Sequence, residues 1–172
     1  LIDAIKKKKV KTIEVDPGYG KYHFDGHRNC NVSMDPEETK KNNGICPICK
    51  KPITIGVLNR VEELADRPKG FVPEDAQEFL TLMPLSEMIN MVNGYKIGTK
   101  KNWQEYYKLV NKERSEFYIL LDAPKEELMN LCGPEMTEVI IKNRKAEIDV
   151  RPGYDGEYGV PLYGNKTKKQ KK

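Results

Sequence analysis

Apolar residues recur every three or four positions through much of the chain, which is the spacing of an amphipathic helix. A proline or a capping residue precedes several of these segments, as is typical of helix starts. The pattern predicts helices at residues 36–41, 57–65, 84–92, 103–110, 124–131 and 134–145, and the end of a helix at residues 1–7. The sequence Asp35-Pro36-Glu37-Glu38 has the cap, the proline and the glutamate of a helix start.

Shorter apolar runs predict strands at residues 10–15, 53–55 and 146–150. Residues 117–121 are ambiguous between a strand and a buried helix, because periodicity alone does not separate the two. A stretch rich in proline and glycine begins at Asp66 and predicts a linker of roughly ten residues.

One apolar stripe has two readings. It lies along one side of the predicted helix at 103–110 and consists of Trp103, Tyr106, Tyr107 and Val110. Such a stripe is more often part of a core than a base-stacking platform, so we expect these side chains to be buried.

Two pairs of soft ligands have the spacing of a zinc ribbon. His27 and Cys30 are separated by two residues, Cys46 and Cys49 likewise, and 15 residues lie between the pairs. Each pair fits the tight turn of a zinc knuckle, in which glycine and asparagine supply left-handed backbone. We therefore predict that His27, Cys30, Cys46 and Cys49 hold a structural Zn²⁺ ion.

Two other residues compete for a place in this set. His23 lies four residues before His27, although a histidine that makes ordinary hydrogen bonds in a strand is the simpler interpretation. Cys132 follows Leu128 and Leu131 at a predicted helix end, where a small buried thiol is usual. With three cysteines on the metal, Cys132 has no disulfide partner, which favours a reducing, intracellular compartment.

These elements predict an α+β fold, with a small zinc-ribbon-like module followed by a mostly helical domain with a few short strands. We expect residues 1–19 to be a helix end and a strand leading from a missing N-terminal domain, because the chain starts at Leu1 inside a helical pattern. Residues 20–66 are then the zinc-binding module, 67–164 the helical C-terminal domain and 165–172 a basic tail.

The charge is concentrated at the two ends. Residues 1–11 carry +4 and residues 165–172 carry +5, which leaves −5 for the body of a chain whose net charge is +4. Any surface that binds DNA must therefore be local. No apolar run reaches the roughly 18 residues of a membrane span and no signal peptide is recognisable, so we expect a cytoplasmic protein that makes no membrane contact.

No catalytic residues can be assigned. The chain has only two histidines, both in the zinc region, and a site with three cysteines and one histidine leaves no position for an activated water. It has no phosphate-binding Walker loop, no nucleophile recognisably paired with a base, and no glutamate two residues after His27 as in a zinc deaminase.

Binding to a phosphate backbone is easier to support. Thr99, Lys100 and Lys101 follow Gly98 at a predicted helix start, where free amides and the helix dipole favour phosphate, although an ordinary cap with solvated lysines has equal weight. Residues 151–159 are rich in glycine and tyrosine, so that Tyr154 beside Arg151 could stack on a base or equally close a core.

Several motifs in the same order resemble endonuclease Q, a DNA-repair nuclease of archaea and some bacteria. They are residues 20–30, the Cys46–Cys49 knuckle, residues 57–68, residues 99–101 and residues 152–156. The resemblance covers nearly all of the chain. It implies a family whose N-terminal polymerase-and-histidinol-phosphatase (PHP) domain carries the catalytic metals and cleaves 5′ of deaminated bases or abasic sites.

The resemblance also implies that this chain corresponds to the zinc-binding and C-terminal domains, without the catalytic PHP domain, its partner in cis. It assigns no catalytic residue to this chain, and it favours contact of Lys100, Lys101 and Arg151 with DNA. The main alternative is a zinc-stapled scaffold for protein or interdomain contacts with no nucleic-acid role. A third reading, a nuclease that uses the ribbon metal itself, needs an open coordination position.

Overall fold

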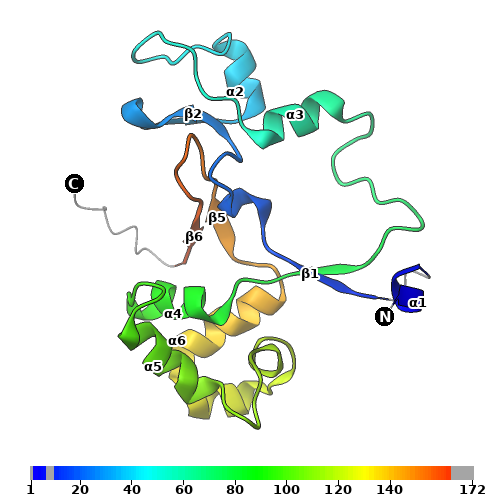
Figure 1. Cartoon of the computed structure of the whole chain (residues 1–172), viewed down its shortest axis with the longest axis vertical. Coiled ribbons are helices and arrows are strands. Elements are labelled where there is room, and N and C mark those ends of the chain that lie inside the picture. The colour runs from blue at the N-terminus through cyan, green and yellow to red at the C-terminus, as the bar shows by residue number, and fades with distance from the viewer. Residues whose placement is uncertain (1, 7–9, 164–172) are drawn as a thin grey trace. The chain divides into compact units, whose positions relative to one another are not determined.

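The computed structural model describes residues 2–6 and 10–163 (Figure 1). The basic tail expected at 165–172 lies outside the described residues, as do the two ends of the helix expected at 1–7. The described residues form two compact units. Unit 1 contains the described part of residues 1–16, residues 78–149 and Tyr163; unit 2 contains residues 17–77 and 150–162. Each unit is thus discontinuous, which differs from the contiguous ranges 20–66 and 67–164 expected above.

Unit 2 begins with a 3₁₀ turn, η1 (Pro17–Tyr19), and two antiparallel strands, β2 (Asp25–His27) and β3 (Val32–Met34), joined by a second 3₁₀ turn, η2 (Arg28–Cys30). Two helices follow, α2 (Pro36–Lys41) and α3 (Val57–Leu64). The start of α2 is the predicted capping box: Asp35 Oδ1 accepts from the Glu38 amide at 2.8 Å, and Glu38 Oε2 accepts from the Asp35 amide at 3.3 Å. The bounds predicted for α2 are confirmed.

Unit 1 is mostly helical. Besides the short helix α1 (Ile2–Lys6), it has a parallel strand pair, β1 (Thr12–Glu14) and β4 (Phe79–Thr81). Three helices, α4 (Leu85–Asn93), α5 (Lys100–Leu109) and α6 (Lys125–Arg144), pack against one another, and α6 also packs against a π-helical turn, η3 (Tyr118–Asp122). The strand β5 (Asp149–Arg151) begins in unit 1 and pairs with β6 (Val160–Leu162). The α+β fold class is confirmed.

The two helices predicted at 124–131 and 134–145 are the two parts of α6. Gly133, with φ 74° and ψ 177°, breaks the helix between them, and Pro134 starts the second part. The ambiguous segment 117–121 is helical, as η3. Ala146 takes a left-handed conformation with φ 53°, which ends the helix and delays the last strand to residues 149–151.

The core of unit 1 lies between α4, η3 and α6. Its large, fully buried apolar side chains are Leu85, Met88, Ile89, Ile119, Leu128, Val139 and Ile140. Burying a side chain of this size stabilises the folded state by about 1.5–3 kcal/mol. Among the described residues, no helix combines the length and apolar character needed to cross a bilayer.

The prediction that the aromatic stripe of α5 is buried is wrong, since Trp103 and Tyr107 are exposed and Tyr106 and Val110 are only half-buried. Trp103 is 40% exposed and Tyr107 is 65% exposed, whereas Asn102 and Leu109 are buried. The cause is a pair of hydrogen bonds, because Asn102 Nδ2 donates to the carbonyls of Ser86 and Tyr95, both at 2.9 Å. These bonds turn the Asn102 side of α5 inward and leave the two aromatic rings outside.

The C-terminal loop, which we define as residues 150–162, belongs to unit 2. It is bound to residues 17–77 of the same unit by backbone hydrogen bonds. Phe24 N donates to the Gly153 carbonyl at 2.9 Å, and Gly153 N donates to the Gly18 carbonyl at 2.9 Å. A Cβ at Gly153 would lie 2.4 Å from the Gly20 carbonyl oxygen. The glycines in this loop thus allow two backbones to approach more closely than side chains would permit.

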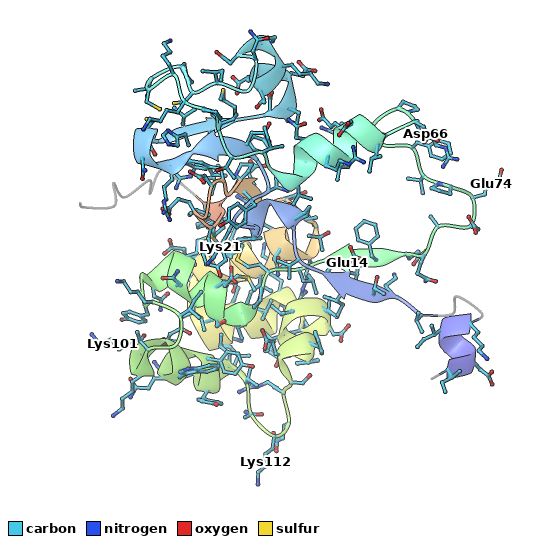
Figure 2. The ribbon with its side chains drawn as sticks, turned by 45° about the horizontal axis from the view of Figure 1, so that its top comes forward. Glu14, Lys21, Asp66, Glu74, Lys101 and Lys112 are labelled. Atoms are coloured by element: carbon cyan, nitrogen blue, oxygen red, sulfur yellow. The ribbon has the colours of Figure 1, made fainter. Side chains whose placement is uncertain are left out.

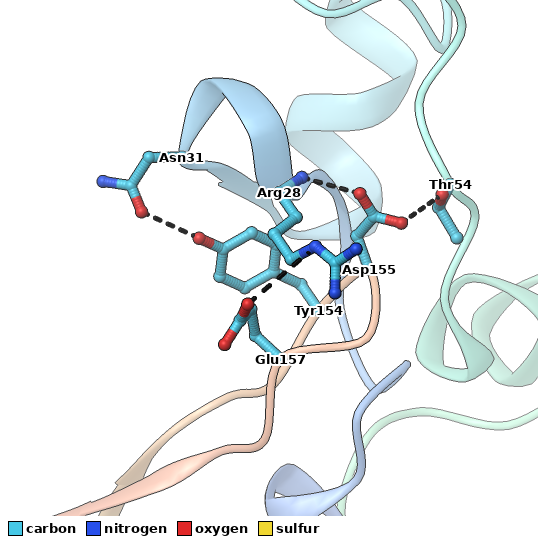
Figure 3. Close-up of polar contacts among 6 residues, drawn as sticks. All are labelled: Arg28, Asn31, Thr54, Tyr154, Asp155 and Glu157. Carbon is cyan, nitrogen blue, oxygen red and sulfur yellow. Dashed lines mark hydrogen bonds and ion pairs between the residues drawn. The ribbon is translucent and has the colours of Figure 1, made fainter. Parts of the chain in front are cut away.

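Side chains of the same loop bind the turn around η2 (Figure 3). The Asp155 carboxylate accepts from Arg28 N and from Thr54 Oγ1, both at 2.6 Å, and Arg28 Nε lies 3.9 Å from Glu157 Oε1. Burial alone would raise the pKa of Asp155, but the hydrogen bonds from Thr54 and Arg28 outweigh it and lower this pKa. The ionised carboxylate is therefore the form that holds the loop in place.

We expect Asp155→Ala to weaken the attachment of the C-terminal loop, because it removes two hydrogen bonds to an ionised group. The free energy of unfolding should fall by about 1.5–3 kcal/mol, and the amides of Phe24 and Gly153 should exchange faster with solvent. Chemical denaturation and hydrogen exchange measure both effects. Glu157→Ala is the matched control, since its exposed 3.9 Å ion pair should contribute less than about 1 kcal/mol. Equal losses in both variants would contradict the role given to Asp155.

Candidate metal centre

The first ligand pair sits on a tight turn between β2 and β3. His27 ends β2, and Cys30 ends η2 three residues later. Asn31 then takes the left-handed conformation, with φ 53° and ψ 40°, and its amide donates to the Arg28 carbonyl at 2.9 Å. The left-handed asparagine expected after the first knuckle is therefore present, and it directs both side chains to the same side of the turn.

The second pair sits on a turn closed by a bridge between Ile45 and Pro52. The Cys46 amide donates to the Lys51 carbonyl at 2.8 Å, and the Lys50 amide donates to the Cys46 carbonyl at 3.0 Å. Lys50 has a left-handed φ of 61° and its ammonium binds the Pro47 carbonyl at 2.9 Å. The local hydrogen bonds thus form a second knuckle that resembles the first.

The two knuckles bring all four predicted ligands together. One donor atom from each of His27, Cys30, Cys46 and Cys49 lies within 4.8 Å of every other. His27 Nδ1 and Cys49 Sγ are 3.3 Å apart. Cys46 is completely buried, and it forms a small core with Met34 and Ile53, against which Cys30, Val32 and Cys49 pack. The four donors therefore converge inside unit 2.

The electrostatics of the thiols favour a bound cation. Burial, together with hydrogen bonds to Cys49 and Cys46, raises the pKa of the Cys30 thiol to about 11. Burial also opposes ionisation of Cys46, but the amides of Cys49 and Ile48 and the His27 ring outweigh it and lower the pKa of Cys46 to about 6. Three thiolates this close repel one another, so they can ionise together only with a positive charge between them.

The donor set fits a tetrahedral metal ion. Sulfur ligands at about 2.3 Å from an ion lie about 3.8 Å from one another in a regular tetrahedron, which is compatible with donors within 4.8 Å. Three sulfurs and one imidazole nitrogen are soft ligands that suit zinc-like cations rather than Mg²⁺ or Ca²⁺. The cluster could therefore hold a metal ion with its four positions filled by protein.

The two competing ligands lie outside this cluster. The His23 ring stacks on Phe24, with centroids 5.6 Å apart and an interplanar angle of 17°. Cys132 belongs to unit 1, where its thiol donates to the Leu128 carbonyl at 3.1 Å and burial raises its pKa. All four cysteines are free of disulfide bonds. Cys132 thus has the role that the sequence suggested, whereas His23 lies in a bend before β2 and not in a strand.

The buried side chain of Asp25 supports the strand that leads into the first knuckle, and this residue was not identified in the sequence. Asp25 is completely buried in β2, where its two oxygens accept from Gly56 N at 2.6 Å and from Asn59 Nδ2 at 2.7 Å. These bonds fix the start of α3 against the strand that carries His27. Asp25 and Asp155 have no local sequence signal, because their partners lie 31 to 127 positions away.

The residues predicted to contact DNA are divided between the two units. Thr99 caps α5, since its Oγ1 accepts from Asn102 N at 3.4 Å and donates to the Lys96 carbonyl at 2.7 Å. Lys100 and Lys101 are exposed in the first turn of α5, and Lys101 lies on the outside of unit 1 (Figure 2), 5.7 Å from the centre of the Tyr95 ring. The structure thus keeps these three together.

The other two predicted DNA residues are in the C-terminal loop of unit 2. Arg151 is exposed at the end of β5. Tyr154 is half-buried, and its hydroxyl donates to Asn31 Oδ1 at 2.9 Å. A Cβ at Gly26 would lie 2.5 Å from the Tyr154 ring, so this ring fills the space beside a strand of the knuckle. The Tyr154 side chain thus makes contacts within unit 2.

Comparison with known proteins identifies relatives over most of the chain. Residues 84–147 match the family described as the MJ0043 C-terminal domain. The chain is 37% identical over 157 residues to the uncharacterized protein MJ0043 of Methanocaldococcus jannaschii, covering 91% of this chain and 20% of that protein. It is 27% identical over 154 residues to the uncharacterized protein YqxK of Bacillus subtilis, covering 89% and 35%. The chain thus spans about a fifth to a third of these relatives.

Two solved structures share the fold. The crystal structure of the lesion-specific endonuclease PfuEndoQ from Pyrococcus furiosus matches with a TM-score of 0.75 and 28% identity, over 89% of this chain and 38% of that one. A crystal structure of endonuclease Q with a 27-mer duplex substrate that has an abasic lesion at the active site matches equally well, over 90% and 38%. These matches confirm that the chain resembles the endonuclease Q family over most of its length.

Proposed function

We propose that this chain is the DNA-engaging, zinc-binding portion of a DNA-repair enzyme like endonuclease Q, which cleaves DNA 5′ of deaminated bases. The single observation that carries the proposal is the match, at a TM-score of 0.75, to an endonuclease Q structure in complex with a duplex that contains an abasic lesion. The catalytic metals of such an enzyme belong to a PHP domain that acts in cis. The partner of this chain is then DNA with a deaminated or abasic site.

The cofactor that suits the candidate centre is a structural Zn²⁺ ion. The four side chains of the donor cluster fill a tetrahedral coordination sphere and leave no position for a reactive water. The apolar core around the cluster is small, with Met34, Cys46 and Ile53 as its buried members. A bound metal supplies the stability that so small a core lacks, and it joins the two knuckles.

The DNA contacts we propose are made by Thr99, Lys100 and Lys101 at the start of α5 and by Arg151 and Tyr154 of the C-terminal loop. Lysine and arginine side chains bind phosphates and release counterions, so that affinity falls steeply as salt rises. A damaged base must leave the stack before an enzyme can act on it, at a cost of a few kcal/mol that backbone contacts help to offset. The exposure of the two lysines is consistent with this role.

A structural scaffold without a nucleic-acid role is the second candidate. The body of the chain, without its two basic ends, has a net charge of −5, and the predicted DNA residues lie in two different units. Both observations fit a module that holds another domain or protein. A mobility-shift assay with plain and uracil-containing duplexes separates the two functions, because a scaffold should shift neither.

The metal assignment predicts a stoichiometric zinc content. We expect about one zinc per chain by mass spectrometry and, after chelation or in Cys46→Ser, loss of hydrogen-exchange protection in residues 20–56, because metal binding and folding are coupled in such sites. Cys132→Ser is the matched control, as it removes a thiol from unit 1 and should keep the zinc. Full protection of residues 20–56 after complete removal of metal would disprove the structural role.

The DNA assignment predicts binding without cleavage. The chain should bind duplex DNA with a strong dependence on salt and should leave a nicking substrate intact. Lys100→Ala with Lys101→Ala should weaken binding and lower the steepness of the salt dependence by about 1 for each phosphate that a lysine no longer neutralises. The pair Lys40→Ala and Lys41→Ala, equal in charge and exposed on α2, is the control and should change little. Identical isotherms for the two double variants would argue against DNA binding at α5.

A further inference from the structure

Two aromatic side chains stand on the outer face of α5. The rings of Trp103 and Tyr107, one helical turn apart, are stacked with centroids 5.8 Å apart and an interplanar angle of 27°. Trp103 is 40% exposed and Tyr107 is 65% exposed. Tryptophan and tyrosine are the side chains that gain most from stacking on another flat ring, and here they are not used in the core.

A third ring holds this pair in place. Tyr106 meets Trp103 edge-on at 5.1 Å and Tyr107 edge-on at 5.4 Å. The Tyr106 hydroxyl donates to Glu116 Oε2 at 2.7 Å, and Glu116 Oε1 in turn accepts from Leu85 N at 2.8 Å, which ties the ring to the start of α4. The exposed pair is therefore ordered before any partner binds, so a ligand does not have to meet the entropic cost of fixing the rings.

The helix that carries the pair has a net positive charge. Lys100 is three residues before Trp103 on the same side of the helix, and Lys101 follows it. Glu105 is the single acidic residue in α5, and the ammonium of Lys108 neutralises it at 2.7 Å. A ligand that matches flat aromatic faces next to two exposed ammonium groups has flat rings joined to anionic groups.

We propose that Trp103 and Tyr107 form a stacking platform for unpaired bases of a DNA strand, whose phosphates lie against Lys100 and Lys101. This inference rests on the proposed DNA function and names the part of the strand that α5 receives. Aromatic faces stack on any base, so the platform contributes affinity without sequence preference. The large apolar side chains exposed on α3, by contrast, are Val57, Val61 and Leu64, which are aliphatic and give a base little to stack on.

The chain carries its own probe for this platform, because Trp103 is the only tryptophan. Adding oligothymidylate of about 12 nucleotides to the full chain should quench the tryptophan fluorescence as a base stacks on the ring. Two ligands serve as charge controls. A strand of the same length made wholly of abasic sites has the phosphates without bases, and polyglutamate has anions without a nucleic-acid backbone. Neither should quench the fluorescence to the same extent.

Substitutions measure how much the rings contribute to affinity. By anisotropy of labelled oligothymidylate, Trp103→Ala and Tyr107→Ala should each weaken binding by about 5- to 100-fold, and Trp103→Phe should retain most of it because a flat ring remains. Phe71→Ala removes a ring that is 52% exposed in unit 2 and is the matched control, with a change below about 2-fold expected. Circular-dichroism melts verify that each variant is folded. If Trp103→Ala does not fold, Tyr107→Ala provides the test, because Tyr107 is the more exposed of the two.

The outcomes separate this inference from the function on which it rests. Base-dependent quenching, with loss of affinity in both alanine variants, supports the platform. If oligothymidylate binds but neither variant weakens it, while Lys100→Ala with Lys101→Ala does, the platform is wrong and the DNA function stands. Equal quenching by polyglutamate would assign the effect to charge and overturn the stacking. If no oligonucleotide binds at any salt concentration, both proposals fail.

Discussion

The convergence of four donor atoms, all within 4.8 Å of one another, is the constraint on which unit 2 depends. Its two knuckles come from separate parts of the chain, and few apolar side chains lie between them: Met34, Cys46 and Ile53 are the buried members. A core of this size recovers little of the conformational entropy that folding costs. Unit 1, with buried residues from α4, η3 and α6, has no comparable need. The two units thus reach stability by different physical means.

Around the donor cluster, hydrogen bonds to two acidic side chains hold separate segments together, a role that apolar packing has in unit 1. Asp25 holds the start of α3 against β2, and Asp155 holds the C-terminal loop against Arg28 and Thr54. Both accept two hydrogen bonds at 2.6–2.7 Å, so the oxygens of each side chain have partners. A unit built this way is sensitive to polar substitutions far from the cluster, since each acidic side chain secures a separate segment to the strand and turn that carry the first ligand pair.

The sequence predicted what is local and missed what is not. The α2 helix is correct to the residue because its capping box lies within four positions, and the ligand set converges because each knuckle is a local turn. The strands β2, β3, β4 and β6 were missed: each has only three residues, and β4 pairs with β1, which is distant in the chain. The exposure of Trp103 was missed because the hydrogen bonds of Asn102, a polar residue, decide which side of α5 faces inward. The density of glycine at 153–159 was the one clue to the docking of the C-terminal loop.

The chain passes between the two units four times, and this connectivity has a consequence for the order of folding. Arg28 and Asp155 are 127 positions apart, so unit 2 cannot close completely until Asp155 has been synthesised. On the ribosome, the two knuckles can close early, whereas unit 2 is complete only after the helices of unit 1 have emerged. Neither unit can therefore be exchanged between proteins as a single uninterrupted stretch of gene. The segments that encode the two units alternate along the gene, so both units are inherited together.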